Sequence, residues 1–572
     1  MKWHIAFATF FWSNTLLAQV YPDYKVPVPD KIVLNYACQT HEIKRLYQDG
    51  AATAPKGSQF TSIISDDAGN LYMTGQSAFD IDPNNAQLTT PITFCSNLTN
   101  PQTRMRAQNH YHFICKYFPD GQLNWVTFFR QKPEKIVWNE AEQKLYALIK
   151  PNNYEIEVNG SIIQLDTAIK YIKSVVLTLD NSNGGVSSVY HHNSIQDILV
   201  AGNKTILIYS NGDSYAYYFG VMYGFFKNNQ VVKWQNTLNG TNFLPTELYY
   251  NTYDNSFWYL NSNSLKYRRL FLHPSADSII TENIDRNIYY ENLPPYGVLS
   301  KPKSFQFTPD GSVISEMNLH PQNSLFHANR GLVKWDTSGN LLWKMNVDVD
   351  KAIVTNDGNL WLTFEYVDYY RRVTVHPGNY EYYINTYGNM VEPKNYLWKI
   401  NGATGELMEA YRNGYGNNLY PSEHLLHITK DNKLIATPQM GAVAYYPDAS
   451  GNFKPYYTTC SNNNMTSQFM WVRFDLNNIK SYKWDEQLEE TVFSQTEQPT
   501  NLFTVYPNPS ANEFSVLTGQ SEAFELYDLT GKMLDKFFVT EKEVYTYRHS
   551  LPQGVYVLRG SPSGVMKKII VH

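Results

Sequence analysis

One short phrase returns in varied form between about residues 60 and 485 of this 572-residue chain. Each copy is an apolar β run, a tight turn rich in Asp, Asn and Gly, and a second β run. Asn and Asp tolerate the left-handed backbone conformation and Gly adopts it freely, so each copy predicts a β-hairpin. The clearest copies are 65–72, 307–313, 354–361 and 428–434.

A second type of hairpin alternates with the first. It consists of an apolar strand with Lys or Asp near its end, a turn, and a strand that often carries Trp. Clear copies are 113–125, 332–343 and 397–407, and weaker copies are 175–186, 223–234 and 471–484. Pairing the two types predicts about seven four-stranded units, at roughly 60–126, 136–189, 198–234, 247–280, 303–345, 351–409 and 424–484.

Four-stranded units repeated in this way, with no helical periodicity between them, are typical of a β-propeller. The spacing also fits six or eight units, and a series of β-sandwiches is the competing fold. The regular alternation of two hairpin types favours propeller blades. The fold class that we expect is therefore all-β: a propeller at 60–484, followed by a small β-sandwich.

Long insertions fall between the second and third strands of several units. They span about 76–110, 150–172, 365–395 and 439–468. In a four-stranded meander this connection lies at the opposite end from the first and third turns. We therefore expect all four insertions to emerge at one face of the propeller, where loops of such length are often functional.

The N-terminus has the pattern of a secretory signal peptide, with Lys2, an apolar stretch from Ile5 to Trp12, and small residues up to Ala18. We expect residues 1–18 to be removed and 19–59 to form a segment before the first blade. No other stretch is long and apolar enough for a transmembrane helix. The net charge of −5 and the pI near 6.3 argue against a nucleic-acid partner.

The chain has four cysteines, which an exported protein can oxidise in three possible pairings; free buried thiols are the alternative. Cys95 lies in the first insertion and Cys115 in the strand that follows, so a local disulfide between them is one prediction. Cys38 precedes the first blade and Cys460 lies in the last insertion, so a second disulfide can join the ends of the ring. The sequence contains no Cys-x-x-Cys pair, so the cysteines do not indicate a zinc site.

Residues 485–500 are acidic and polar and predict a linker, and 501–572 contain short strands separated by turn residues. This last segment resembles the type A C-terminal sorting domain of the type IX secretion system of Bacteroidetes. The resemblance rests on four ordered motifs: 506–509, 526–532, 551–558 and 567–571. The sorting-motif residues are Tyr506, Pro507, Asn508, Pro509, Asp528, Gly531, Lys532, Gly554, Tyr556, Lys567 and Lys568.

The resemblance implies a destination. Such a domain directs its protein from the periplasm across the outer membrane and is usually cleaved there, leaving the product released or attached to the cell surface. The implied partner is the type IX secretion machinery, and the implied location is extracellular or on the outer-membrane surface. The resemblance implies nothing about the activity of the propeller.

Few residues indicate chemistry. His110 and His112 could share one face of a strand as a metal pair, but a solvated strand edge fits better because no third ligand is near in sequence. Asp66, Asp310, Asp357 and Asp431 occupy hairpin turns, where capping explains them better than a calcium or catalytic site. With no nucleotide, metal or nucleophile motif, we expect no cofactor and no metal, and the sequence leans away from an enzyme.

The third of the long insertions is the candidate binding loop, because Tyr beside Arg and Asn suits glycan or protein contacts. Its residues are Tyr366, Tyr369, Tyr370, Arg371, Arg372, Tyr380, Tyr382, Tyr383 and Tyr387. The alternative is that these rings pack the loop onto the propeller.

Three functions fit the sequence. The first is an exported propeller that binds a glycan or a protein through its long loops. The second is a secreted enzyme that degrades polysaccharide or peptide, with its site at the mouth of the central channel. The third is a structural or adhesin-like surface component.

Overall fold

The protein is described here by a computed structural model. The residues that it describes are 24–38, 58–77, 91–105, 110–167, 172, 174–192, 195–211, 220–228, 230–236, 248–261, 266–272, 279–286, 304–318, 330–338, 340–347, 349, 351–364, 372–376, 380–383, 396–412, 425–437, 444–456, 466–483, 503–506, 512–518, 521–528, 532–540, 544–561 and 566–571. The chain forms two compact units, Met1–Lys483 and Trp484–His572. Among the described residues we find no helix that is long and apolar enough to cross a membrane.

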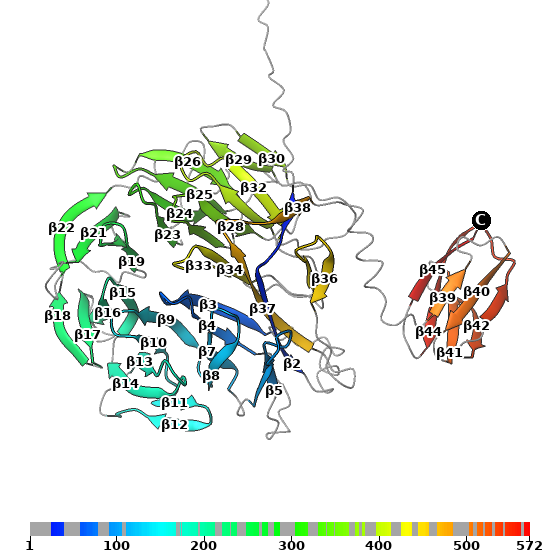
Figure 1. The fold of residues 1–572 in the computed structure, drawn as a ribbon, viewed down its shortest axis with the longest axis horizontal. Helices are drawn as coiled ribbons and strands as arrows, with labels where there is room; N and C mark the ends of the chain where they lie inside the picture. Colours follow the sequence, from blue (N-terminus) through cyan, green and yellow to red (C-terminus); the bar gives the residue numbers. More distant parts are fainter. Residues whose placement is uncertain are drawn as a thin grey trace, which may run out of the picture. The chain divides into compact units, whose positions relative to one another are not determined.

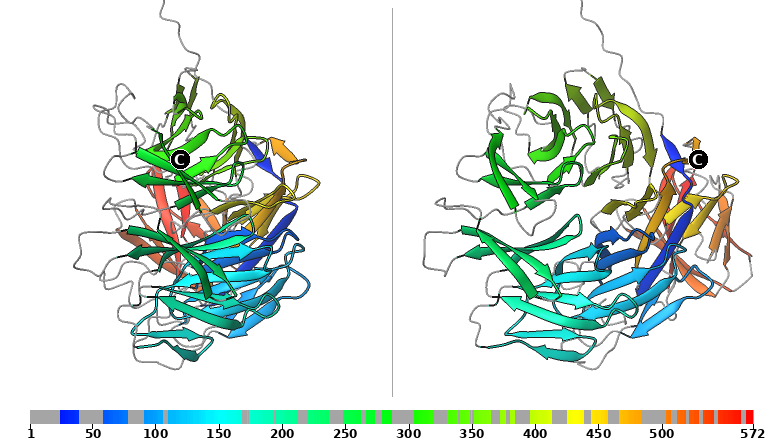
Figure 2. Two further views of the ribbon diagram at one scale, coloured as in Figure 1. Left: turned by 90° about the vertical axis from the view of Figure 1, so that its left-hand side faces the viewer. Right: turned by 60° about the vertical axis from the view of Figure 1, so that its left-hand side comes forward.

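The first unit is an all-β propeller, as the repeat predicts. Within its described residues, seven sheets each contain four antiparallel strands, and Figure 1 shows β3, β9, β15 and β33 on the side of their sheets toward the middle. Figure 2 shows the same sheets from two other sides. The four-stranded sets are β3 (Gln59–Ser65), β4 (Leu71–Gln76), β7 (His112–Tyr117) and β8 (Leu123–Phe129); β9 (Pro133–Asn139), β10 (Lys144–Ile149), β13 (Ser174–Leu179) and β14 (Val186–His192); β15 (Ile195–Ala201), β16 (Lys204–Asn211), β17 (Gly220–Lys227) and β18 (Gln230–Asn236); β19 (Leu248–Asn251), β20 (Ser256–Asn261), β21 (Lys266–Leu272) and β22 (Ile279–Arg286); β23 (Ser304–Phe307), β24 (Val313–Asn318), β25 (Arg330–Trp335) and β26 (Leu341–Asn346); β27 (Lys351–Val354), β28 (Leu360–Phe364), β31 (Tyr396–Ile400) and β32 (Leu407–Arg412); and β33 (Leu425–Ile428), β34 (Lys433–Thr437), β37 (Thr466–Asp475) and β2 (Lys31–Cys38).

The first-type hairpins share one turn geometry. In each of four copies, the residue that opens the turn donates its N–H to the carbonyl four positions later and accepts from the N–H three positions later. The fourth turn residue has a positive φ, near +80° in three copies and +61° in the last. Those residues are Gly69, Gly311, Gly358 and Asn432. Gly and Asn recur there because other side chains are strained in that conformation.

Side chains of the second-type hairpins form hydrogen bonds between neighbouring sheets. The indole N–H of Trp343 and the ammonium group of Lys334 both donate to the carbonyl of Gly402, at 3.0 and 2.9 Å. Trp125 and Lys116 donate to the carbonyl of Asn181 in the same way, at 3.0 and 3.3 Å. Both Gly402 and Asn181 lie in the corresponding turn of the next sheet. The Lys and Trp of the repeat therefore join each of these sheets to its successor.

The last sheet is completed by the N-terminal segment. Strand β2 pairs along its whole length with β37, from Lys31 opposite Arg473 to Cys38 opposite Thr466. The prediction that residues 424–484 supply all four strands of this unit is wrong. Strand β38 (Ser481–Lys483) pairs instead with β1 (Lys25–Pro27), which lies beside β32 of the preceding sheet.

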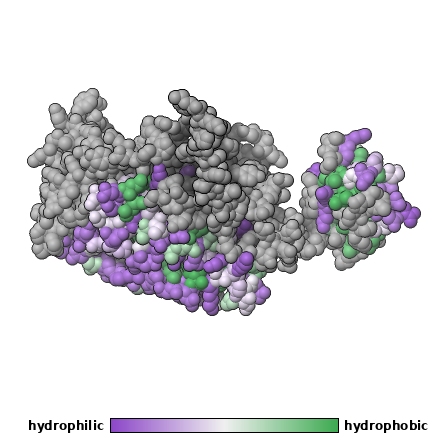
Figure 3. Space-filling view, turned by 90° about the horizontal axis from the view of Figure 1, so that it is seen from above, coloured by the Kyte–Doolittle hydropathy of each residue, from purple (hydrophilic) through white to green (hydrophobic). Residues whose placement is uncertain are grey.

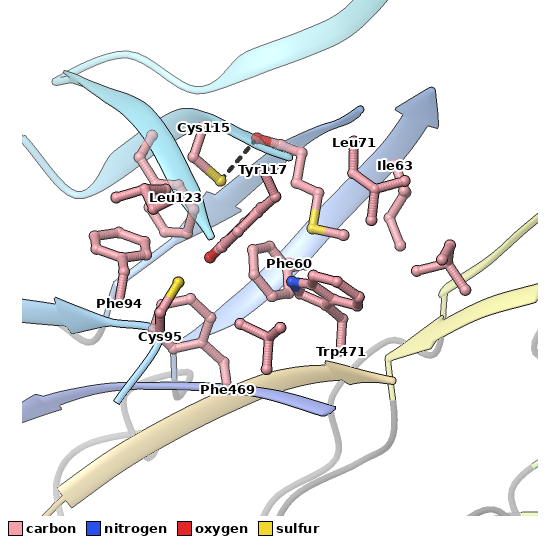
Figure 4. Packing of buried hydrophobic residues seen from close by; sticks show 14 of the residues in the cluster. Phe60, Ile63, Leu71, Phe94, Cys95, Cys115, Tyr117, Leu123, Phe469 and Trp471 are labelled. Carbon is pink, nitrogen blue, oxygen red and sulfur yellow. Dashed lines mark hydrogen bonds between the residues drawn. The ribbon is translucent and has the colours of Figure 1, made fainter. Parts of the chain in front are cut away.

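Asn35 of β2 is fully buried and bonds three other segments. Its side-chain oxygen accepts from the N–H of Cys95 at 3.0 Å and from the hydroxyl of Tyr117 at 3.1 Å, and its amide donates to the carbonyl of Phe469 at 3.3 Å. Figure 4 shows the apolar cluster that these three partners share with Phe60. The cluster contains residues from strands near both ends of the propeller sequence, so β2 holds the first and last sheets together.

Each long insertion contains a β-hairpin between the second and third strands of its sheet. The hairpins are β5 (Pro91–Phe94) with β6 (Gln102–Met105), β11 (Glu155–Val158) with β12 (Ser161–Gln164), β29 (Arg372–His376) with β30 (Tyr380–Tyr383), and β35 (Ala444–Pro447) with β36 (Phe453–Tyr456). Three of them extend another sheet: β5 pairs with β2, β11 with β8, and β29 with β26. In each case the hairpin joins the outer strand of the sheet before its own.

The second unit is a β-sandwich of two sheets. One contains β39 (Phe503–Tyr506), β40 (Glu513–Thr518) and β43 (Val544–Arg548). The other has the order β42 (Met533–Val539), β41 (Glu522–Tyr527), β44 (Gly554–Ser561) and β45 (Met566–Val571). Apolar residues alternate along the strands and meet in one buried cluster that includes Phe514, Phe524, Leu526 and Leu558. This alternation is what a sheet with one solvated face requires.

Candidate functional site: the sorting unit and the insertion hairpins

The sorting-motif residues that the structure describes stabilise turns and strand ends. Lys532 donates its N–H to the carboxylate of Asp528 at 3.0 Å, which closes the β41–β42 turn. The Tyr556 hydroxyl donates to the carbonyl of Pro552 at 2.7 Å, and its ring is buried. The ammonium group of Lys567 lies 5.6 Å from the centroid of the Phe503 ring.

The other motif residues are less informative. Lys568 is exposed on β45, opposite Val557 of β44. Gly554 begins β44, and a Cβ added there would meet no atom closer than 3.7 Å, so close packing does not require glycine. Tyr506 ends β39, but its side chain, together with Pro507, Asn508, Pro509 and Gly531, lies outside the described residues.

The candidate binding loop contains the hairpin β29–β30. Its backbone pairs Arg372 with Tyr383, Val373 with Tyr382, and Val375 with Tyr380. Val375 is fully buried beside the position of Gly405 in the next sheet. The hairpin is thus attached to the propeller along β26. Tyr366, Tyr369, Tyr370, Arg371 and Tyr387 lie outside the described residues.

All four insertions leave their sheets at the same end of the strands, as the topology predicts. What the sequence did not indicate is where they go next. Val158 of β11 pairs with Phe129, the last residue of β8, and Ile92 of β5 pairs with Ala37 near the end of β2. The hairpins therefore widen the outer rim of the propeller at its insertion end.

A cluster of buried polar side chains lies at the insertion end of the sheet β27–β28–β31–β32. The rings of Tyr24 and Tyr396 have centroids 5.3 Å apart, and the guanidinium group of Arg412 lies 5.8 Å from the Tyr24 ring. Burial raises the pKa of Tyr24, Tyr396 raises it further, and Arg412 and Trp398 oppose the rise. This group fixes the start of β1. Sequence reasoning missed it because its members are almost 400 residues apart.

Within the part of the chain that the structure describes, Ser65 and His427 form a Ser–His pair between inner strands, which sequence reasoning also missed. The hydroxyl of Ser65 in β3 lies 2.8 Å from Nε2 of His427 in β33. Burial lowers the pKa of His427 to about 4, and no carboxylate contributes to this shift. A general base needs a pKa near the working pH and a group that orients its ring. The pair is better explained as a contact between the first and last sheets.

The other chemical candidates are structural. The expected solvated strand edge is wrong for His110, which is buried and whose Nε2 accepts from the N–H of Gly160 at 3.2 Å. Burial and then the charge of Lys132 lower the pKa of His112 to about 4. Among the described residues, no three His, Cys, Asp or Glu side chains are grouped so that they could hold a metal ion.

The turn aspartates cap their hairpins, as expected. The carboxylate of Asp66 accepts from the N–H of Asn70 at 2.8 Å, that of Asp310 from the N–H of Ser312 at 2.9 Å, and that of Asp357 from the N–H of Asn359 at 3.1 Å. The Asp431 carboxylate accepts from the Thr429 hydroxyl. Burial raises the pKa of Asp310, but bonds from Thr308 and Ser312 and the charge of Lys334 outweigh it and lower the pKa to about 2.

The predicted disulfide between Cys95 and Cys115 is not formed. Both are buried free thiols, and each thiol donates to a backbone carbonyl, Cys95 to Gly121 at 3.2 Å and Cys115 to Met73 at 3.7 Å. Figure 4 shows both sulfurs within the apolar cluster. The pairing of Cys38 with Cys460 lies outside the described residues, since only the backbone of Cys38 is described.

Comparisons with solved structures found likenesses of very low similarity. A putative 6-phosphogluconolactonase from Bacteroides uniformis is 10% identical, with 79% of this chain and 100% of that chain covered and a TM-score of 0.32. The polysaccharide lyase Uly1 is 10% identical, covering 79% and 99%, with a TM-score of 0.29. The β-propeller domain of the Trilobed protease from Pyrococcus furiosus is 8% identical, covering 72% and 99%, with a TM-score of 0.27.

These likenesses are too weak to say anything about activity. No curated protein matches the chain. Residues 504–572, in contrast, match the family described as the secretion system C-terminal sorting domain. The match covers most of the second unit and the four motifs of the resemblance. This protein is therefore exported to the cell surface or the medium by the type IX route, through a C-terminal sorting domain that follows a β-propeller.

Proposed function

We propose that the propeller is a recognition module that binds a glycan or a protein partner at its insertion end. The observation that carries this proposal is the shared placement of the four insertion hairpins. Each lies between the second and third strands of its sheet, and three are paired to the sheet before their own. Strand pairing holds these three insertions in place, so binding through them would need little ordering of the protein.

The composition of the third insertion supports this function. Tyr combines a large apolar area with a hydroxyl, and Arg and Asn add adaptable polar contacts. The backbone of β29–β30 is anchored at Lys344, Met345 and Asn346 of β26. Arg372 and Tyr383 occupy a register position that alternates with buried Val375, so they are the residues to alter first.

The test is a glycan and polysaccharide array probed with residues 19–483, followed by product analysis of any hit. We expect binding without turnover. The variant Arg372→Ser/Tyr383→Ser should bind at least tenfold more weakly. The matched control is Ser182→Ala/Asn183→Ala in the β13–β14 turn at the opposite end, which should bind normally.

Three outcomes would contradict this proposal. Turnover of a bound glycan would favour an enzyme. Binding that both variants retain would move the site away from β29–β30. If no glycan binds and a biotinylated propeller captures no protein from the surface of other cells, the structural or adhesin-like alternative would replace recognition.

A further inference from the structure

The outer rim of the propeller has seven edge strands among the described residues. Insertion hairpins and the N-terminal segment extend four sheets, which end in β6, β12, β30 and β38, whereas three neighbouring sheets end in their own fourth strands, β14, β18 and β22. Figure 1 shows β14 on the outer side of its sheet, away from β9. No described strand pairs with the free side of an edge strand, so its outward N–H and C=O groups can pair with an added strand.

β14 lacks the charges that usually protect such an edge. Proteins commonly place Lys, other charged residues or Pro on edge strands, which disfavours pairing with another chain. Among the outer edges, β6, β18, β22, β30 and β38 all carry charged residues, namely Arg104, Lys233, Glu282, Asp285, Arg286, Glu381 and Lys483. β12 and β14 have neither a charged residue nor Pro, and β14 is the longer of the two, with 7 residues against 4.

β14 is held firmly from inside the propeller. It pairs in regular register with β13 over residues 188–192. The ring of Tyr190 lies 5.1 Å from that of Phe226 in the third sheet, and Val189 packs against the apolar cluster between the first two sheets. This part of the strand can therefore accept a partner strand without first being ordered, which lowers the cost of association.

The other described surfaces of the propeller offer less to a partner. On the face drawn in Figure 3, hydrophilic residues cover most of the described propeller surface, and apolar residues form only small patches. The exposed large apolar side chains are spread over several sheets, as Phe118, Val232 and Met408 illustrate. An uncharged edge strand needs no such patch, because its backbone supplies the hydrogen bonds.

The sequence of β14 fits a second copy of itself. In an antiparallel pair with a two-fold axis at Tyr190, this residue lies opposite the same residue of the second copy, and Ser188 lies opposite His192 of the second copy. Aromatic residues that face each other across two strands stabilise the pair, and no like charges meet. The neighbouring edge β18 differs, because Lys233 is its middle residue and would be placed opposite its own copy.

We propose that β14 joins two copies of this protein edge to edge in an antiparallel, two-fold symmetric dimer. The two four-stranded sheets then form one continuous sheet. Since antiparallel pairing reverses the strand direction, the insertion ends of the two copies point in opposite directions. The dimer is independent of the ligand proposed for the propeller. Pairing of two short strands buries less than the roughly 1,600 Å² of a standard interface, so dimerisation should depend on protein concentration.

The test is sedimentation velocity of residues 19–572 over a concentration series, in which we expect a reversible dimer. The variant Ser188→Lys/His192→Lys places like charges opposite each other at both ends of the pair and should weaken the dimer at least tenfold. The variant Ser188→Lys/His192→Glu places opposite charges there and should restore the dimer. Within one copy the two positions are about 13 Å apart, so these charge pairs form only between copies.

The matched control is Gln230→Lys/Val232→Lys, which adds the same charge at two exposed positions of the neighbouring edge β18. It should dimerise like the native chain. Circular dichroism and the melting temperature check that each variant is folded. Hydrogen exchange of the native chain needs no variant: the β14 amides should exchange more slowly at high than at low protein concentration, whereas the β18 amides should not change.

Four outcomes would overturn the proposal. They are a native chain that stays monomeric at every concentration, a dimer that the double-lysine variant retains, a dimer that the lysine–glutamate variant fails to restore although it is folded, and β14 amides whose exchange does not depend on concentration. The second outcome would place the interface elsewhere on the chain, and the third would exclude the two-fold register at Tyr190.

Discussion

Replacing Asn35 with Ala tests whether β2 holds the first and last sheets of the propeller together. The substitution removes three hydrogen bonds, to the N–H of Cys95, the hydroxyl of Tyr117 and the carbonyl of Phe469. Each buried bond contributes about 1 kcal/mol, and each partner left unsatisfied costs about 1–3 kcal/mol. Because Asn35 is fully buried, water does not readily replace its side chain. We expect a loss of at least about 3 kcal/mol of unfolding free energy.

The assay is unfolding of residues 19–483 in guanidinium chloride, monitored by tryptophan fluorescence. Hydrogen exchange of the β2 amides gives a local readout. Asn97→Ala is the matched control. Asn97 also ties β2 to the first insertion, accepting from the N–H of Leu34 and donating to the carbonyl of Ile32, both at 2.9 Å, but Asn97 is exposed. It should cost about 1 kcal/mol. If Asn35→Ala costs no more than Asn97→Ala, the reasoning about buried unsatisfied groups is refuted here.

Three more outcomes are expected. Lys334→Met leaves the carbonyl of Gly402 with Trp343 alone and should cost about 1–3 kcal/mol; an unchanged denaturation midpoint would show that the Lys–Trp pair does not join the sheets. The pKa of His427 is lowered to about 4, so its contribution of at most about 3 kcal/mol is complete above pH 6.5 and is lost as the pH falls toward 4, because the unfolded chain takes up the proton first. His427→Gln should flatten this part of the stability–pH curve, and a curve of unchanged slope would contradict the assignment. Gly184→Ala should cost more than 2 kcal/mol, since φ is +73° and a Cβ would lie 2.4 Å from Trp125, whereas Gly554→Ala should be nearly neutral; equal melting temperatures for the two variants would rule out this distinction.

The hairpin repeat was the most predictive part of the sequence, because its cause is local. A positive φ at the fourth turn residue requires Gly or Asn, and four copies have Gly69, Gly311, Gly358 and Asn432 there. The fourth unit, 247–280, was harder to recognise, since β21 and β22 form a hairpin without such a turn signal. The Lys and Trp of the second hairpin type were visible as a pattern, but their shared carbonyl lies in the next sheet.

The candidate sites were less predictable. The motifs at 506–571 identified the sorting domain because they are short and local. The expected Cys95–Cys115 disulfide failed because nearness along the chain does not set the direction of the side chains. Each thiol bonds a different backbone carbonyl.

The sequence by itself determined the all-β class, the four-stranded units, the place of the insertions and the export signal. All of these depend on turns, alternation and motifs within a few residues of each other. Only the tertiary structure decided that β2 completes the last sheet, that insertion hairpins extend the sheets before their own, and that Ser65 meets His427. Those contacts join residues up to more than 400 positions apart, and hydrophobic burial and strand pairing between distant segments select them, which no local pattern records.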